Sequence, residues 1–285
     1  DNSKMRRGVP VAHAIYGIAS TINCANYVYF LALEKISQLG KPEAVTVFLQ
    51  EMLNLHRGQG LDILWRDSNK CPSEEEYMSM VKDKTSGLFR LAVSLMQVFS
   101  ANRSNFNFNP LTELLGVYFQ IRDDYLNLLS DSFTRSKSYC EDITEGKFSF
   151  PIIHAVLSDP ADTHLLHILR MHTDDDAVKL SAVRWIHKCG SFEYTKTVLN
   201  RLFSNVSCEI ERLGGHPALS ALLYKLDSEI EKHILPPPLS PPTTTNNSAL
   251  QLELLTQLQT QSDHIVPTEE RERAEAVRGG GGGGG

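Results

Sequence analysis

The sequence predicts an all-α protein, and three observations support this fold class. Apolar residues recur at steps of three and four through the first 235 residues, which is the spacing of amphipathic helices. No segment alternates strictly between apolar and polar residues, and no Asn-Gly pair marks a hairpin. Helix start and stop residues separate the periodic segments. The predicted helices cover residues 11–39, 42–55, 73–100, 110–129, 152–157, 163–171, 176–188, 192–213 and 217–234.

Local signals place several of these helix boundaries. Ser73 and Glu76 have the spacing of a capping box, and Asp176 stands at the start of another helix. Residues 40–42, Gly-Lys-Pro, and the Asn109-Pro110 pair predict breaks. The boundaries are therefore typical of long helices joined by short connections, as in a helical bundle.

Two segments, 11–33 and 111–129, are apolar around much of the helix circumference. Helices of this kind lie at the centre of a bundle, where neighbours cover every side. A polar group on such a helix is costly unless it is paired, bound to a ligand or facing a cavity. We therefore expect both segments to be central and their polar residues to be informative.

The composition divides the chain into two parts. Residues 1–235 form the predicted helical domain, and six of the 13 prolines lie after it. Residues 236–285 read as a Pro-rich linker followed by a disordered tail, with a possible short helix at 249–262 and a run of glycines at the end. We expect this tail to have no part in catalysis.

Charge and cysteine content exclude several classes of protein. The net charge of −6 gives no general attraction to nucleic acid. The five cysteines are scattered without a CxxC pair, which argues against a disulfide framework and favours a reducing compartment. No apolar run is long enough to span a membrane. The chain begins with Asp1 rather than Met, so we expect a fragment or a processed product.

An acidic stripe interrupts the apolar segment at residues 119–127. Gln120, Asp123, Asp124 and Asn127 are three or four residues apart and share one helix face. Their oxygen atoms are the hard ligands that Mg²⁺ prefers, and Mg²⁺ commonly completes its coordination with phosphate oxygens of a substrate. A solvated acidic face is the alternative interpretation of this spacing.

A charged loop follows at residues 137–151. Lys137 and Lys147 frame an acidic run, and Gly146 permits a left-handed turn. Lysine ammonium groups bind phosphate as point charges, so the loop and the acidic stripe together could hold a diphosphate. An ordinary charged surface loop remains the alternative.

Three further motifs are weaker when each is taken alone. The Arg6-Arg7 pair suits phosphate recognition, although it could equally be a solvated basic segment. The Lys84-Thr85 pair could place a cation and a hydroxyl in a cavity. The glycines at residues 56–62 indicate either a close approach between helices or a kink. Gln59 and Asp62 share a helix face there, where they could form hydrogen bonds between helices or belong to a site.

Taken in order, these motifs resemble those of trans-prenyltransferases, and most closely the geranylgeranyl diphosphate synthases of animals and fungi. The resemblance covers residues 1 to about 232. It is carried by Arg-Arg-Gly at 6–8, His-Arg-Gly-Gln-Gly-Leu-Asp at 56–62, Lys-Thr-Ser-Gly-Leu-Phe at 84–89, Phe-Gln-Ile-Arg-Asp-Asp-Tyr-Leu-Asn at 119–127 and Glu-Asp-Ile-Thr-Glu-Gly-Lys-Phe-Ser-Phe-Pro at 141–151.

The resemblance implies a bundle of long, mostly antiparallel helices around a central cavity, assembled as a cytoplasmic homo-oligomer. It implies Mg²⁺-dependent condensation of isopentenyl diphosphate with an allylic diphosphate, either farnesyl or the shorter geranyl and dimethylallyl forms. The product would be geranylgeranyl diphosphate. Two aspartate-rich motifs would hold Mg²⁺ against the allylic diphosphate.

The resemblance also implies roles for individual residues. Asp123 and Asp124 would be metal ligands from the second aspartate-rich motif, and Asp1 would be the last aspartate of the first. The groups implied to bind substrate are Lys84, Lys137 and Lys147 at the allylic diphosphate, Thr85 and Gln120 at the reacting carbocation, Arg6 at the allylic site and Arg7 at the isopentenyl site.

Two alternatives follow from the same sequence. Since the earlier aspartates of the first motif do not precede Asp1, this chain could be an inactive, N-terminally truncated isoform, or a non-catalytic subunit that binds another prenyltransferase. The other alternative is a helical interaction protein unrelated to isoprenoids, which would leave the acids and lysines within apolar helices unexplained.

Overall fold

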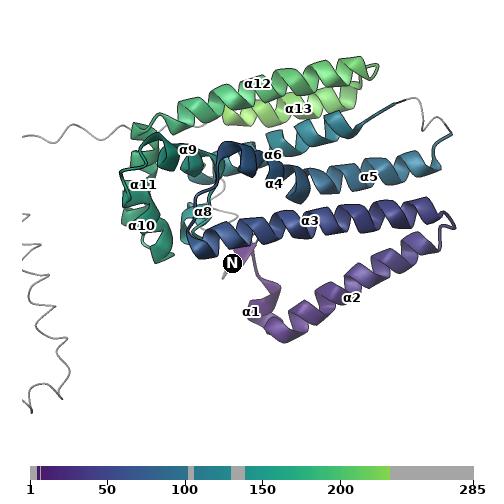
Figure 1. The fold of residues 1–285 in the computed structure, drawn as a ribbon, viewed down its shortest axis with the longest axis horizontal. Helices are drawn as coiled ribbons and strands as arrows, with labels where there is room; N and C mark the ends of the chain where they lie inside the picture. Colours follow the sequence, from purple (N-terminus) through teal and green to yellow (C-terminus); the bar gives the residue numbers. More distant parts are fainter. Residues whose placement is uncertain (1–4, 7, 102–105, 130–138, 232–285) are drawn as a thin grey trace, which may run out of the picture. The chain divides into compact units, whose positions relative to one another are not determined.

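Helices make up nearly all of the regular secondary structure, so the predicted all-α class is confirmed (Figure 1). The structure is a computed structural model that describes residues 5–6, 8–101, 106–129 and 139–231. The predicted linker and tail, 236–285, with the possible helix at 249–262, lie outside these residues.

A short antiparallel hairpin, β1 (Met5–Arg6) and β2 (Val9–Pro10), precedes the helices. The helices are α1 (Ala12–Tyr16), α2 (Ile18–Ser37), α3 (Pro42–Ser68), α4 (Glu74–Lys84), α5 (Ser86–Phe99), α6 (Asn109–Leu129), α8 (Glu141–Thr144), α9 (Phe150–Ser158), α10 (His164–Met171), α11 (Asp176–Lys188), α12 (Ser191–Arg212) and α13 (Pro217–Ile230). Within the described residues, no helix combines the length and apolar character that a membrane span requires.

The helix boundaries follow several of the predicted signals. The Ser73 hydroxyl accepts from the amide of Glu76, and the Glu76 carboxylate accepts from the amide of Ser73, which completes the capping box. Helix α11 begins at Asp176 as predicted, but the side chain that caps it is that of Asp175. Helix α3 continues to Ser68, well beyond the predicted end at residue 55.

Two segments that were predicted as single helices are each divided. The 73–100 segment breaks at Thr85, between α4 and α5. The 11–39 segment breaks at Gly17, whose φ of +81° ends α1 in a conformation that favours glycine. Apolar periodicity continues across both breaks, which is why the pattern alone could not reveal them.

Helix α6 lies at the centre of the bundle, as predicted for residues 111–129. It packs against α4, α5, α8, α9 and α12 (Figure 1). Its buried Arg122 donates to the Leu226 carbonyl of α13 at 2.9 Å and pairs with Glu229 of the same helix. The Tyr118 hydroxyl donates to Asp227 at 3.1 Å. Helix α13 therefore anchors α6 through these two side chains.

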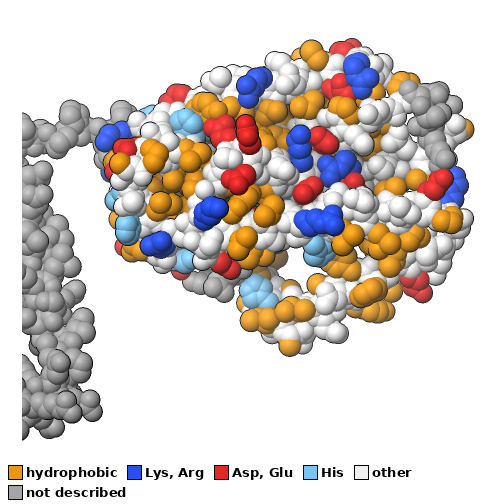
Figure 2. Space-filling model, viewed as in Figure 1, with side chains coloured by type: hydrophobic (Ala, Val, Ile, Leu, Met, Phe, Trp, Pro, Cys, Tyr) orange, Lys and Arg blue, Asp and Glu red, His pale blue; other side chains and the backbone are white. Residues whose placement is uncertain are grey.

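Helix α2 contradicts the prediction that residues 11–33 are central. None of its residues is buried, and it packs only against α1 and α3 among its closer neighbours. One contact to α3 brings the Tyr29 and His56 rings 5.6 Å apart. Figure 2 shows the resulting hydrophobic side chains along the lower arm of the molecule, over α1 and α2. The apolar circumference of α2 is exposed rather than covered.

Candidate active site

A cavity of about 290 Å³ lies between the β1 hairpin, α3, α4, α6 and the α8 loop. Acidic and basic side chains line it together, which is the combination that an anionic substrate and a metal ion require. The lining residues are Met5, Arg6, Gln59, Asp62, Arg66, Lys84, Gln120, Asp123, Glu141, Asp142, Glu145 and Lys147.

The wall formed by α3 and α4 depends on one close contact between the helices. A Cβ atom added at Gly58 would lie 2.6 Å from the backbone nitrogen of Lys84, so only glycine fits there. Gly60 has no such neighbour within 4 Å. The close approach brings the Lys84 ammonium within 2.6 Å of the Asp62 carboxylate. The motif at residues 56–62 thus marks a helix contact that positions a cation at the cavity.

The second wall carries Gln120 and Asp123 of α6, which both line the cavity. The Thr85 hydroxyl donates to Gln120 Oε1 at 2.8 Å, and Gln120 Nε2 donates to Asp124 Oδ1 at 2.9 Å. The helix break at Thr85 lies beside this pair. Hydrogen bonds therefore connect the residues predicted from two separate motifs.

Asp124 is fully buried, in contrast to Asp123. Burial alone would raise its pKa, but the Lys147 ammonium at 2.8 Å, the Tyr77 hydroxyl at 2.6 Å and the Phe150 amide at 2.9 Å hold that pKa below its usual value. Burial also opposes the charge of Lys147, yet the carboxylates of Asp124 and Asp142 keep the pKa of Lys147 well above its ordinary value. The pair is therefore ionised.

The loop from residue 140 to 147 folds over the end of α6. Asn127 Oδ1 accepts from the Asp142 amide at 3.1 Å, which uses the Asn127 side chain to hold the loop. Gly146 takes a φ of +68°, and a Cβ there would lie 2.6 Å from the His172 ring. The predicted left-handed turn is present, and this packing requires glycine as well.

Asp142 is the best evidence that the cavity suits a cation. Its Oδ2 atom is buried and has no hydrogen-bond donor among the residues that the structure describes. Burial raises the pKa of Asp142 to about 7, although Lys147 opposes this shift. A divalent cation would supply the missing partner. No three His, Cys, Asp or Glu residues of the described part are grouped to hold a metal by themselves, so substrate oxygens would have to complete its coordination.

Comparison with known proteins identifies the family. The polyprenyl synthetase model matches residues 1–186. The chain is 54% identical over 228 residues to a geranylgeranyl pyrophosphate synthase of Dictyostelium discoideum, covering 80% of this chain and 75% of that protein. The chain belongs to the polyprenyl synthetase family. The resemblance to prenyltransferases of the geranylgeranyl diphosphate synthase type, inferred from the ordered motifs, is thereby confirmed.

Two further relatives support the same assignment. A geranylgeranyl pyrophosphate synthase of Mucor circinelloides f. lusitanicus is 52% identical over 229 residues, which are 80% of this chain and 75% of that protein. Another of Aspergillus fumigatus is 56% identical over 202 residues, or 71% and 56% respectively. The polyprenyl synthetase match includes every residue that lines the cavity.

The structure brings together the predicted residues that it describes. Arg6, Lys84, Gln120, Asp123 and Lys147 line the cavity. Thr85 and Asp124 contact that group through hydrogen bonds. The other predicted site residues lie outside the described part of the chain: Asp1, Arg7 and Lys137.

Sequence reasoning missed several residues of the site. Asp62 and Asp142 stood within recognised motifs, but the sequence did not show that they pair with Lys84 and Lys147 respectively. Tyr77 carried no signal, because its hydroxyl meets Asp124 across 47 residues of sequence. Only the packing of α4 against α6 reveals that contact.

Proposed function

We propose that this protein condenses farnesyl diphosphate with isopentenyl diphosphate to form geranylgeranyl diphosphate, in a reaction that requires Mg²⁺. The names of its relatives support the product, and the geometry supports the type of reaction. The single observation that carries the proposal is the cavity where Asp123 and Asp142 lie beside Lys84 and Lys147. Geranyl and dimethylallyl diphosphates are possible shorter allylic substrates.

The cavity residues have complementary roles in this proposal. Asp123, with Asp1 of the first motif, binds the metal, and bound Mg²⁺ would supply positive charge against the departing diphosphate. Lys84 and Lys147, with Lys137, bind the allylic diphosphate. The residues proposed for the isopentenyl and allylic ends are Arg7 and Arg6 respectively.

Thr85 and Gln120 act on the organic part of the substrate. When the allylic carbon–oxygen bond breaks, positive charge develops on carbon, and oxygen dipoles fixed nearby stabilise it. The double bond of isopentenyl diphosphate then attacks this carbon, and loss of a proton gives the lengthened chain. The Thr85–Gln120 hydrogen bond at 2.8 Å supports this role, because it holds both groups in place.

The reaction is tested with the complete protein, farnesyl and isopentenyl diphosphates and Mg²⁺. We expect the twenty-carbon diphosphate, identified by mass spectrometry. Asp123→Ala should lower kcat by about 100-fold or more, as when one group that stabilises developing charge is removed, with an unchanged unfolding midpoint. A fifteen-carbon product alone, or product formed equally well with chelator, would reject the proposal.

We also propose that the protein forms a cytoplasmic homo-oligomer through α2. Residues 18–33 of this helix carry no charged side chain, and large apolar residues such as Tyr27 and Phe30 are exposed. An apolar surface this long supports a protein partner, and a second copy presents the same uncharged face.

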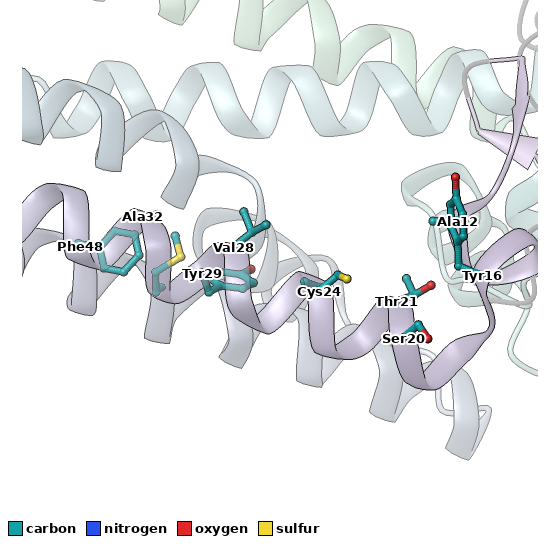
Figure 3. Close-up of a pocket in the computed structure, with 11 residues that line it drawn as sticks. Ala12, Tyr16, Ser20, Thr21, Cys24, Val28, Tyr29, Ala32 and Phe48 are labelled. Carbon is teal, nitrogen blue, oxygen red and sulfur yellow. The ribbon is translucent and has the colours of Figure 1, made fainter.

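A cavity of about 750 Å³ adjoins this surface, between α1, α2 and the start of α3 (Figure 3). Tyr16 comes from α1, Cys24 and Val28 from α2, and Phe48 from α3. Its lining is predominantly apolar, which supports the burial of this region in the assembly. Sedimentation velocity of the complete protein measures the assembly.

A further inference from the structure

The two adjacent carboxylates of α6 have opposite surroundings. Asp123 lines the cavity, whereas Asp124 has an exposed fraction of 0%. Both oxygens of Asp124 already accept two hydrogen bonds each. The donors are Gln120 Nε2 at 2.9 Å and Lys147 Nζ at 2.8 Å on Oδ1, and the Tyr77 hydroxyl at 2.6 Å and the Phe150 amide at 2.9 Å on Oδ2.

A carboxylate has about four lone-pair positions, so four donors saturate it. A metal ion could bind Asp124 only by displacing a donor inside the protein. Losing a partner in a buried site costs each donor its desolvation energy. Asp123 has no such burial and faces the space where substrate phosphate would complete a metal's coordination.

We infer that Asp124 is a positioning residue that orients Gln120 and Lys147, and that it is not a metal ligand. The inference rests on the proposed function, because it assigns the task of one residue within that site. It separates two aspartates that the sequence motif treats as equivalent.

Asp124 fixes the orientation of the Gln120 amide. An ionised carboxylate only accepts hydrogen bonds, so the amide must turn its NH₂ group towards Asp124. Gln120 Oε1 is then the acceptor for the Thr85 hydroxyl. Thr85 uses its hydrogen on Gln120, which leaves its oxygen lone pairs for another partner. A carbocation is stabilised by oxygen atoms that face it. Asp124 therefore sets the direction of the Gln120 and Thr85 dipoles without facing the substrate itself.

Asp124 also holds the Lys147 ammonium group in position. The ammonium donates to Asp124 and lies 3.6 Å from Asp142, and its side chain is only 14% exposed. An ammonium has three donors, so it can bind Asp124 and still offer others to a diphosphate in the cavity. Loss of Asp124 would remove the closer of these two carboxylates and leave the ammonium with the longer contact to Asp142.

Tyr77 gives the sharpest test of the inference. Its ring is buried in the core on α4, and its hydroxyl reaches Asp124 without lining the cavity. Tyr77→Phe removes one donor, keeps the ring and changes no charge. Loss of this hydrogen bond should therefore lower activity while the groups that contact substrate remain in place.

The experiment compares Tyr77→Phe, Asp124→Asn and Asp123→Asn in the complete protein. Binding of Mn²⁺ in the presence of inorganic pyrophosphate is followed by electron paramagnetic resonance, and kcat and KM are measured separately. We expect Asp123→Asn to weaken Mn²⁺ binding by about tenfold or more. Tyr77→Phe should leave Mn²⁺ binding within about twofold and lower kcat by about tenfold, the effect of one hydrogen bond to a charged group.

Asp124→Asn should lower kcat further, with a smaller effect on Mn²⁺ binding than Asp123→Asn. Equal loss of Mn²⁺ binding in the two aspartate variants, or an unchanged kcat in Tyr77→Phe, would overturn the inference. If Asp124→Asn does not fold, Tyr77→Phe still decides. Absence of prenyl transfer by the unchanged protein would reject the proposed function instead, and the Mn²⁺ comparison would still decide whether Asp124 is a ligand.

Discussion

Helices α2 and α6 are similar in sequence character and opposite in burial. They have 20 and 21 residues, and both are apolar around much of their circumference. Helix α6 buries residues on every side, whereas α2 buries none within this chain. The comparison teaches that an apolar helix surface predicts contact with other protein surface. It does not show whether that surface belongs to the same chain.

Their charged residues distinguish the two helices better than their apolar ones. The only charges of α2, Glu34 and Lys35, stand near its exposed end. Helix α6 carries Arg122 and Asp124 in buried positions, each with named partners. Because a buried charge without partners is costly, charges inside an apolar helix indicate that the same chain surrounds it.

The largest expected effect concerns stability. Leu126 of α6 is 2% exposed and Phe30 of α2 is 70% exposed. Leu126→Ala should reduce the free energy of unfolding by about 2–5 kcal/mol, because it leaves a cavity in the core. Phe30→Ala should change it by about 0.5 kcal/mol or less in the dissociated protein. Urea unfolding at low protein concentration measures both, and similar losses would break the comparison.

A smaller effect is expected within α3, which packs against α2 and also against α4 and α5 (Figure 1). Gly58→Ala would force α3 from α4 and should cost about 1–3 kcal/mol of stability, as in overpacked cores. Gly60→Ala is the matched control, since it meets nothing within 4 Å and should gain about 1 kcal/mol from helix propensity. Thermal unfolding compares them, and equal effects would contradict the close contact at Gly58.

The third prediction tests what covers α2. Phe30→Glu places a charge on the apolar face and should shift the sedimentation coefficient towards the monomer, with the circular dichroism spectrum unchanged. A Glu substitution at Tyr224, which is 62% exposed on α13, serves as the control and should leave the assembly intact. An unaltered assembly in Phe30→Glu would mean that α2 is not the contact surface.

The smallest effect is a difference in thiol reactivity. Cys24 of α2 and Cys208 of α12 are both exposed in the chain, whereas burial raises the pKa of Cys140 to about 12. In a disulfide-exchange assay at pH 8, Cys208 should react fast because it is exposed. Cys140 should react slowly because it is buried and its raised pKa leaves little of the reactive thiolate. Cys24 should be protected in the assembly and should react like Cys208 after Phe30→Glu.

The sequence was sufficient for the fold class and for much of the cavity, because periodicity and short motifs are local properties. It could not show that α2 is exposed within this chain, since apolar spacing does not tell which helices the rest of the chain covers. It also could not separate Asp123 from Asp124. Adjacent residues point about 100° apart on a helix, and the packing of α4 and α9 against α6 decides which one is enclosed.

The break at Thr85 has a similar cause. Apolar spacing continues from α4 into α5, so periodicity predicts one helix through residues 73–100. The hydrogen bond from Thr85 to Gln120 spans 35 residues, and such a contact is invisible to a local pattern. The helix break that the sequence pattern did not predict therefore lies at Thr85, a residue of the candidate site.

The anchoring of α6 by α13 has a consequence for how the protein is made. The partners of Arg122 lie 104 and 107 residues further along the chain. During synthesis, the helix that carries Asp123 therefore leaves the ribosome long before those partners exist. Until α13 is added, the Arg122 guanidinium lacks the acceptors that allow it to be buried. The helix that carries one wall of the cavity is thus anchored by the last helix to be translated among those described.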